Sequence, residues 1–296
     1  MKKLGFIGGG NMAEALARGL LDNRVFTPDE LLVADIDAGR RRKISRALKV
    51  ETTADNRAIR DNSRALLIAV KPQQIDEVMA ELADEGTVDG PPALSRKRIG
   101  KAAAKRPPQV SGKRSDDRLY ISIAAGITLE RLSTGLKTAR VIRVMPNAPA
   151  MVGQGMAALT GASGVSKADE TFALKIFRAV GDAVALKDER LLDAVTALSG
   201  SGPAYFYLFI KALADSAVSE GLPAELAIRM ALKTMRGAEE NMRRSPLSAA
   251  ELIRIVASPG GTTEAALRKF AEAGFSDIVA AAIRAAAERS RELGRS

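Results

Sequence analysis

Two glycine-rich segments hold the residues whose types and spacing best suit chemistry. The first follows a short apolar stretch at 4–7 and fits the pattern G-x-G-x-x-G/A: Gly8-Gly9-Gly10-Asn11-Met12-Ala13. In that pattern the first glycine makes a tight turn, the second lets the backbone approach a pyrophosphate, and the small last residue packs a helix onto a strand. Because a helix start offers N–H groups and partial positive charge to phosphates, the segment predicts a dinucleotide site. The alternative is a glycine-rich turn without a ligand.

The second segment leads into a helical pattern at 262–272 and reads Ser258-Pro259-Gly260-Gly261-Thr262-Thr263. Its two glycines let the backbone come close to a ligand, and N–H groups at the helix start suit a carboxylate. The two threonines add hydroxyl donors. Taken by itself, the segment also fits a helix cap that follows a glycine turn.

The amino-acid types that are missing narrow the chemistry. The 296 residues include no histidine and no cysteine. Thiolate catalysis, a Ser-His-Asp relay and zinc sites built on His or Cys are therefore excluded, and we expect no metal. No disulfide can form, which agrees with a reducing cytoplasm. Hydride transfer from a bound cofactor needs none of the missing types.

The elements that must position these segments alternate along the first part of the chain. Helical patterns such as 40–48 and 73–82 separate apolar stretches at 4–7, 31–34, 65–70, 119–123 and 141–145. Strands that alternate with helices indicate a parallel sheet covered on both faces. After residue 188 helical patterns dominate. We therefore predict an α/β Rossmann-type nucleotide-binding domain at 1–187, followed by an all-α domain at 188–296.

One segment breaks the alternation and holds most of the excess charge. Residues 84–118 are rich in Gly and Pro, and 89–118 has nine Lys or Arg against three Asp, which is +6 of the net +10. We expect a long, flexible surface insertion. Because this segment is positively charged, binding of an acidic partner to it is an alternative. Because aromatic residues make up only 4% of the chain, stacking platforms for bases are scarce, and we do not expect nucleic acid as the main partner.

The sequence shows no targeting signal and no stretch of 18 uncharged apolar residues. We therefore expect no membrane association and a cytoplasmic protein.

Residues after the second expected strand bear on the choice of cofactor. Asp35 stands at the end of that strand, where an acidic residue binds the ribose 2′-hydroxyl of NAD. Arg40, Arg41 and Arg42 follow closely, and guanidinium groups there can hold the 2′-phosphate of NADP. These arginines could also form a solvated helix start. We slightly favour NADP (NADPH), with NAD (NADH) as the alternative.

Further segments, taken together with the two above, resemble one family. In order they are Gly5-Phe6-Ile7-Gly8-Gly9-Gly10-Asn11-Met12-Ala13, Ala69-Val70-Lys71-Pro72, Ile121-Ser122-Ile123-Ala124-Ala125-Gly126, Arg143-Val144-Met145-Pro146-Asn147, Leu198-Ser199-Gly200-Ser201-Gly202-Pro203-Ala204-Tyr205 and Ser258-Pro259-Gly260-Gly261-Thr262-Thr263. This set resembles the pyrroline-5-carboxylate reductases over nearly all of 1–83 and 119–293. Residues 84–118 lie outside the likeness.

The resemblance implies reduction of 1-pyrroline-5-carboxylate to L-proline by NAD(P)H, the final step of proline biosynthesis. It also implies that the helical domain at 188–296 serves dimerisation and substrate binding. A homodimer is expected, and a higher ring of dimers is the further assembly that the family suggests.

The resemblance also assigns residues. Thr263 is implied as the catalytic hydroxyl that faces the imine nitrogen, and Thr262, Gly260, Gly261 and Glu189 are implied in substrate binding. Glu189 could instead be a solvated acid in the first turn of a helix. The implied cofactor-binding residues are Ile7, Gly8, Gly9, Gly10, Asn11, Met12, Ala34, Asp35, Arg40, Asn56, Ala69, Val70, Lys71, Pro72, Ile123, Ala124 and Ala125.

One departure from the family pattern and two other functions stay open. Ile255 stands where the family often has a polar residue that reaches the neighbouring subunit's cofactor, so we do not predict that contact.

A related imine or hydroxyacid reductase on the same fold is one alternative function. A noncatalytic NAD(P)-binding regulator is the other; it would keep the turn at 8–13 without needing Thr263. Tyr207 and Lys211 have the short-chain dehydrogenase spacing, but they lie far beyond the nucleotide domain.

Overall fold

The structure is a computed structural model, and it describes residues 1–83 and 118–295. Contacts between backbone segments divide the chain into two compact units. Unit 1 is Met1–Val144 with Ala150–Glu189, and unit 2 is Met145–Pro149 with Arg190–Ser296. The sequence predicted a domain boundary after residue 187. The expected insertion at 84–118 lies outside the described residues, except for its last residue, Arg118.

Unit 1 contains one eight-stranded sheet with the order β3-β2-β1-β4-β5-β6-β7-β8. The strands are β1 (Lys2–Ile7), β2 (Leu31–Ala34), β3 (Glu51–Thr53), β4 (Ser63–Ile68), β5 (Leu119–Ser122), β6 (Val141–Met145), β7 (Gly155–Gly161) and β8 (Gly181–Ala185). Neighbouring strands from β3 to β6 pair in parallel, and so do β7 and β8. The order 3-2-1-4-5-6 is that of a Rossmann sheet, which confirms the predicted fold class.

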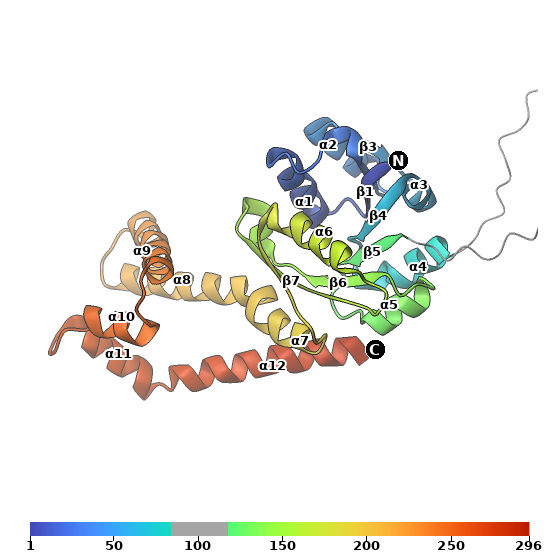
Figure 1. The fold of residues 1–296 in the computed structure, drawn as a ribbon. Coiled ribbons are helices and arrows are strands. Elements are labelled where there is room, and N and C mark those ends of the chain that lie inside the picture. Colours follow the sequence, from blue (N-terminus) through green and yellow to red (C-terminus); the bar gives the residue numbers. More distant parts are fainter. Residues whose placement is uncertain (84–117, 296) are drawn as a thin grey trace, which may run out of the picture. The chain divides into compact units, whose positions relative to one another are not determined.

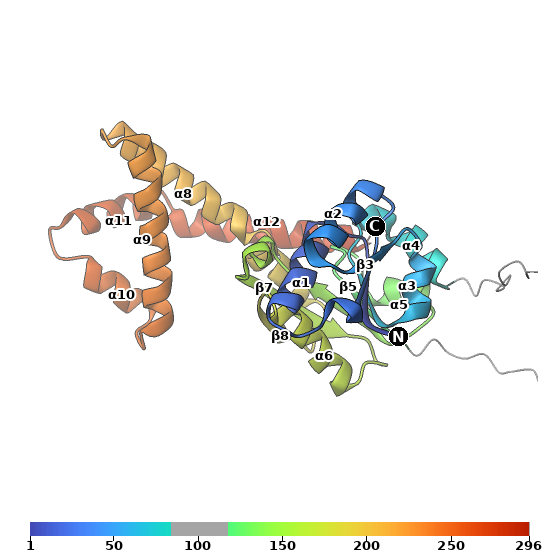
Figure 2. The same ribbon diagram turned by 90° about the horizontal axis from the view of Figure 1, so that it is seen from above.

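Helices cover both faces of this sheet, as Figures 1 and 2 show. They are α1 (Asn11–Asp22), α2 (Ala38–Leu48), α3 (Asn56–Asn62), α4 (Ile75–Ala83), α5 (Leu129–Gly135) and α6 (Lys167–Arg178). Side chains alternate along each strand, so Leu4 and Phe6 of β1 join the core under α1, α2 and α6. Ile7 joins the second core, with residues of α3, α4 and α5. The strand ends therefore stay fixed between two buried layers.

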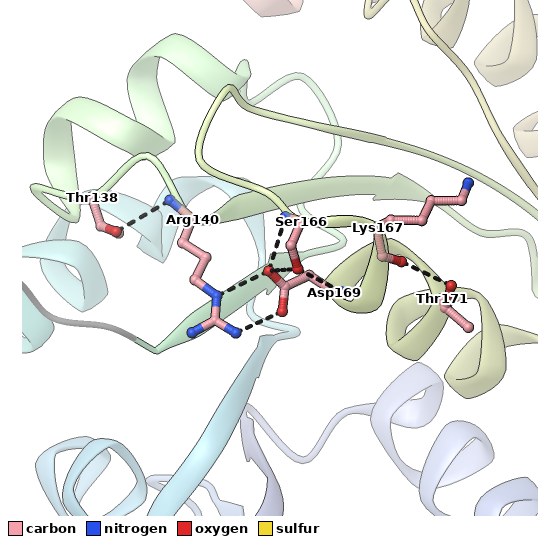
Figure 3. Close-up of polar contacts among 6 residues, drawn as sticks. All are labelled: Thr138, Arg140, Ser166, Lys167, Asp169 and Thr171. Carbon is pink, nitrogen blue, oxygen red and sulfur yellow. Dashed lines mark hydrogen bonds and ion pairs between the residues drawn. The ribbon is translucent and has the colours of Figure 1, made fainter.

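Helix α6 is fastened to the sheet through its first turn (Figure 3). The Ser166 hydroxyl accepts the N–H of Asp169, and the Asp169 carboxylate accepts the N–H of Ser166, so the two residues form a capping box. The same carboxylate accepts two hydrogen bonds from the guanidinium of Arg140, at 3.0 and 2.6 Å. Arg140 immediately precedes β6, so these bonds tie α6 to the start of that strand.

Unit 2 consists of helices, as the sequence predicted. They are α7 (Leu191–Val195), a single π-helical turn (Thr196–Gly200), α8 (Gly202–Ser219), α9 (Ala224–Arg244), α10 (Ala249–Val256), α11 (Thr262–Glu272) and α12 (Phe275–Arg295). Helix α12 runs back to α7, where the Ser290 hydroxyl donates to Oδ1 of Asp193 at 2.7 Å. The rings of Phe209, Phe270 and Phe275 cluster with centroids 5.4–6.3 Å apart.

The described helices of unit 2 leave much apolar surface exposed. Buried apolar side chains are few in this part of the chain: Leu192, Ala197, Ile210, Ala214 and Ala227. Large apolar side chains are exposed along α8, α9, α10 and α12, among them Phe206, Leu208, Met230, Leu232, Ile253, Ile255 and Ile278. An apolar surface of this extent marks an interaction site rather than a solvent face. None of the described helices is long and apolar enough to cross a membrane.

Candidate active site

The dinucleotide turn lies where β1 ends and α1 begins. Gly8 has a φ of +91°, and its N–H donates to the carbonyl of Ala34 at 2.9 Å. A Cβ on Gly8 would lie 3.0 Å from the backbone carbonyl group of Ala69. Both the positive φ and this close approach require glycine, as expected for the first position of the motif.

Gly9 and Gly10 meet different constraints. A Cβ on Gly9 would lie 2.6 Å from the Cδ1 atom of Ile44, so the protein itself leaves no room there. Gly10 caps α1 with an ordinary φ of −61°, and a Cβ built on it would meet no atom within 4 Å. The turn therefore has open space in front of Gly10, at the N-terminus of α1. That space fits a pyrophosphate bound by the N–H groups of the helix start.

Asp35 faces this turn from the end of β2. Its Oδ2 accepts the N–H of Gly9 at 2.8 Å, and its Oδ1 accepts the N–H of Asp37 at 2.8 Å. Ala34, the preceding residue, is fully buried as the last residue of β2. The carboxylate is therefore held at the position where the adenosine ribose of a dinucleotide binds in this fold.

The arginines after β2 are already in contact with protein groups. Nε of Arg40 donates to the carbonyl of Gly9, and its Nη2 forms an ion pair with Glu14 at 2.9 Å. Arg41 donates to the carbonyls of Asp35 and Ile36, at 2.7 and 3.0 Å. Both side chains thus brace the turn and the loop behind it.

Glu14 of α1 is the acidic partner in this group. Burial raises the pKa of Glu14, but the hydrogen bond from Lys43 and the charge of Arg40 outweigh it, so the net pKa lies below the usual value. Glu14 is therefore ionised at neutral pH. It also forms an ion pair with Arg18 at 3.3 Å, so three cations share its charge.

The other expected cofactor residues follow the carboxyl ends of strands. Ala69, Val70, Lys71 and Pro72 come after β4, which ends at Ile68, two residues earlier than the apolar run suggested. The expected Ile123, Ala124 and Ala125 come directly after β5. Together with the turn after β1, these segments flank the switch in strand order between β1 and β4, where open α/β sheets bind ligands.

Asn56 and the last residues of the turn occupy helix starts. Asn56 is the first residue of α3, and its side-chain amide donates to Glu81 at 2.7 Å. Asn11 and Met12 open α1, with Asn11 exposed and Met12 half-buried.

The threonine segment lies in unit 2 and begins a helix at the expected residue. Helix α11 starts at Thr262, so Thr262 and Thr263 lie in its first turn. Gly260 has a φ of +72° and Gly261 is the N-cap. The first N–H groups of a helix have no partner within the helix, which makes this turn an anion-binding position.

The Gly260 backbone already binds a carboxylate. The N–H of Gly260 donates to Oε2 of Glu264 at 2.6 Å, and the N–H of Gly261 donates to the carbonyl of Ser258 at 3.0 Å. Glu264 is the third residue of α11, so this hydrogen bond is a cap that the helix makes with its own side chain.

Glu189 is placed differently from a solvated acid. Its Oε1 accepts both Nη1 of Arg143 at 2.6 Å and the N–H of Leu129 at 2.9 Å. Arg143 lies on β6 and Leu129 begins α5. Sequence reasoning missed Arg143 as a partner, although an arginine inside the apolar strand 141–145 is a signal for a buried ion pair.

Among residues 1–83 and 118–295, no three His, Cys, Asp or Glu side chains gather where they could hold a metal ion.

Comparison with known protein families gives a match for each unit. Residues 189–293 match a family described as pyrroline-5-carboxylate reductase dimerisation. Residues 3–89 match a family described as NADP oxidoreductase, coenzyme F420-dependent. The first match covers nearly all of the helical unit, and the second covers the dinucleotide turn with its flanking strands and helices.

Individual relatives cover the chain from end to end. A pyrroline-5-carboxylate reductase from Synechocystis is 39% identical over 99% of this chain and 98% of its own length. The structure of one from Coxiella burnetii matches with a TM-score of 0.84 at 31% identity, covering 100% of this chain and 99% of the other. A Plasmodium falciparum pyrroline carboxylate reductase structure with NADP bound matches with a TM-score of 0.80 at 26% identity, covering 99% and 98%. The chain belongs to the pyrroline-5-carboxylate reductase family.

Proposed function

We propose that this protein reduces 1-pyrroline-5-carboxylate to L-proline with NAD(P)H. The observation that carries the proposal is the combination of two sites in one chain of this family. Unit 1 has an open dinucleotide turn at Gly10, and unit 2 has a helix start at Thr262 that follows two glycines. A noncatalytic NAD(P)-binding regulator would need the first site but not the second.

The residues of unit 1 fit a dinucleotide. Gly8 makes the turn, Gly10 leaves space for the backbone to approach the pyrophosphate, and the start of α1 supplies N–H groups. The backbone after β4 and β5 follows strand ends on the side of the switch point opposite β1 and would line the rest of the site, through Ala69–Pro72 and Ile123–Ala125. When bound, NAD(P)H supplies the hydride that reduces the imine carbon.

The proposed preference between the two cofactors rests on Asp35. Arginines after β2 favour NADPH slightly when only the sequence is considered. In the structure, however, Arg40 and Arg41 already bind carbonyls and Glu14, whereas the Asp35 carboxylate is held against Gly9. A carboxylate there accepts hydrogen bonds from ribose hydroxyls and repels a 2′-phosphate. We therefore expect NADH to be the better donor, with NADPH as the competing outcome.

The substrate contacts proposed for unit 2 follow from the geometry of the helix start. A substrate carboxylate needs N–H donors, and the start of α11 at Thr262 and Thr263 offers N–H groups that have no partner within the helix. The N–H of Gly260 donates to Glu264 and that of Gly261 to the carbonyl of Ser258, so at these two glycines the substrate would have to replace a partner that the protein supplies. The Thr263 hydroxyl would face the imine nitrogen and orient or relay the proton that the nitrogen gains. A threonine hydroxyl is too weak an acid to protonate it unaided.

We propose a homodimer as the active assembly. The exposed apolar side chains of α8, α9 and α10 form a surface that a second subunit would cover. The family that residues 189–293 match is described as pyrroline-5-carboxylate reductase dimerisation. A ring of dimers is the further assembly that the sequence suggested, and sedimentation velocity separates a dimer from a ring by mass. The cytoplasmic location stays a prediction from the sequence.

The experiment that tests the function is a turnover assay. Purified protein is mixed with NADH or NADPH and 1-pyrroline-5-carboxylate, and both cofactor oxidation and L-proline formation are followed. We expect one L-proline for each cofactor oxidised. A dimer that binds cofactor but forms no L-proline would instead support the regulator. Turnover of other cyclic imines or hydroxyacids in its place would support a related reductase.

A further inference from the structure

One oxygen atom of Glu189 closes the base of the loop that follows β5. Oε1 of Glu189 accepts Nη1 of Arg143 at 2.6 Å and the N–H of Leu129 at 2.9 Å. Leu129 begins α5 directly after this loop, and Arg143 on β6 pairs in register with Ser122, the last residue of β5, directly before it. The loop at 123–128 therefore starts beside one partner of the ion pair and ends at the other. All of these residues belong to unit 1.

The loop at 123–128 is packed along its sides and exposed at its tip. Ala125 is exposed, whereas Ala124 and Ile127 are buried. Gly126, next to the tip, has a φ of +76°, a backbone conformation that glycine adopts without strain. The N–H of Ala124 donates to the Ser122 hydroxyl at 3.3 Å. The loop is thus fastened close to the sheet, and its tip can meet a ligand.

The place of this loop in the sheet indicates which part of a dinucleotide it would contact. In a Rossmann sheet, each half of the strands holds one mononucleotide of the cofactor. Strands β1, β2 and β3 form the half that includes Asp35, at the position of the adenosine ribose. Strands β4, β5 and β6 form the other half, and the loop follows the carboxyl end of β5. The loop therefore belongs to the half that would hold the nicotinamide.

The ion pair at the base of the loop is largely shielded from water. Only 9% of the Arg143 side chain and 28% of the Glu189 side chain are exposed. A short hydrogen bond between two charged groups is among the stronger polar contacts in proteins, and removal of one partner leaves the other as an uncompensated charge. The N–H of Leu129 has no partner within its helix, so Glu189 also satisfies this donor. The carboxylate thus couples the end of the loop to β6.

We propose that Arg143 and Glu189 are positioning residues that hold the loop at 123–128 in the conformation that receives the nicotinamide half of NAD(P)H. The inference rests on the proposed function, because it takes the loop as part of the cofactor site. In this role neither side chain touches the cofactor; both act through the backbone of the loop. A small displacement of the nicotinamide would lower the rate of hydride transfer strongly. The role differs from the substrate contact that the sequence suggested for Glu189.

Two ligands distinguish this role from a general loss of stability. NADH contains both halves of the dinucleotide, whereas ADP-ribose lacks the nicotinamide. Glu189→Ala removes the acceptor of both hydrogen bonds, and Arg143→Met removes the guanidinium but keeps an unbranched chain. In a calorimetric titration each variant should bind NADH about tenfold more weakly, as expected for loss of a charged hydrogen bond that orders the site. The Kd for ADP-ribose should stay at the wild-type value, because the half of the sheet with Asp35 is unchanged.

Amide hydrogen exchange of the free protein gives a readout that involves no ligand. The peptide that covers 123–129 should exchange faster in both variants, whereas the turn at 8–13 should keep its wild-type protection. Arg143→Lys retains a positive charge and should recover part of the NADH affinity and of the protection. It also replaces Arg143→Met if that variant fails to fold. Glu189→Gln, which keeps an acceptor for the N–H of Leu129, replaces Glu189→Ala in the same way and should show a smaller effect.

The matched control is Asp169→Asn, which breaks another 2.6 Å ion pair of unit 1, at the start of α6. This variant should keep wild-type affinity for NADH and wild-type exchange at 123–129.

Two results would overturn the proposal: normal NADH binding in the Arg143 and Glu189 variants, or an equal loss of NADH and ADP-ribose binding. Normal NADH binding together with a raised KM for 1-pyrroline-5-carboxylate in Glu189→Gln would assign the carboxylate to the substrate instead. If the wild-type protein binds NADH but forms no L-proline, the proposed function fails. The comparison of NADH with ADP-ribose still decides in that case whether the ion pair positions the loop.

Discussion

The N–H of Gly9 donates a hydrogen bond to Oδ2 of Asp35 at 2.8 Å, which joins the glycine turn after β1 to the end of β2. This bond places a negative charge beside the turn, and the position of that charge bears directly on which cofactor the protein accepts.

Replacing Asp35 should change the cofactor preference. In Asp35→Ser, a hydroxyl replaces the carboxylate, so repulsion of a 2′-phosphate is removed. We expect the ratio of kcat/KM for NADPH over NADH to rise by about tenfold or more, since tenfold corresponds to about 1.4 kcal/mol of binding energy. Steady-state kinetics with both cofactors measure the ratio. An unchanged ratio would show that Asp35 does not face the ribose.

Two glycines of the turn should respond to alanine in opposite ways. Gly10→Ala meets no protein atom within 4 Å, so the free protein should keep its thermal stability. The added methyl would occupy the space proposed for the pyrophosphate, and overpacking of about 1–3 kcal/mol should weaken cofactor binding by roughly ten- to a hundredfold.

Gly8→Ala is the matched comparison. Its φ of +91° and the contact with Ala69 should destabilise the free protein, with the positive φ alone costing roughly 1–2 kcal/mol. Fluorescence titration and thermal melts separate the two effects. Normal cofactor affinity in Gly10→Ala would place the pyrophosphate elsewhere.

The hydroxyl of Thr263 should matter for the reaction and little for the fold. Thr263→Val keeps the branched shape and removes the donor, so unfolding and dimer mass should be unchanged. Loss of one well-placed donor at a reacting centre lowers the rate by about 10²-fold or more. Thr263→Ser, which keeps a hydroxyl, should retain much of kcat/KM. Equal rates for the valine variant and the wild-type protein would remove Thr263 from the catalytic step.

Asp169 should make stability depend on pH. The hydrogen bond from Arg140 lowers the pKa of Asp169 from 3.8 to about 2, against the opposing effect of burial. Because the folded-state pKa lies below the unfolded value, the stabilisation is present above about pH 4 and is lost as the pH falls through about 2. The shift corresponds to about 2 kcal/mol.

Urea unfolding of Asp169→Asn and wild-type protein at pH 7, 4 and 3 tests this dependence. The variant should lose about 2 kcal/mol at pH 7 and progressively less as the pH falls below 4. Glu170→Gln is the control, since it removes a surface pair with Lys167 of the kind worth at most about 1 kcal/mol. A constant difference between Asp169→Asn and wild-type protein across this range would contradict the assignment.

Much of the fold could be predicted because local sequence patterns specify most of its helices and strands. The apolar strands, the glycine turn and the helical patterns after residue 188 each specify a local structure, and the Rossmann sheet follows from their order. Boundaries were less exact. β4 ends before Ala69, although the apolar run continues to Val70, because hydrogen bonds to neighbouring strands decide where a strand stops.

The contacts of the site residues could not be predicted from the sequence. Glu189 and Arg143 meet only because β6 and the segment before α7 are brought together by the fold, and no spacing pattern records such a long-range pair. The same holds for Arg40, because its hydrogen bond to Gly9 and its ion pair with Glu14 depend on how α2 packs beside α1. Motifs identified which residues matter, whereas packing determined their partners.

We propose that this chain combines a dinucleotide site with a helix start that binds the substrate carboxylate. Cofactor oxidation by the purified protein with 1-pyrroline-5-carboxylate, with L-proline measured as the product, tests this combination. We expect one L-proline for each NADH or NADPH oxidised, and a large loss of this rate in Thr263→Val. Cofactor binding without any L-proline formation, in a correctly assembled dimer, would contradict this proposal.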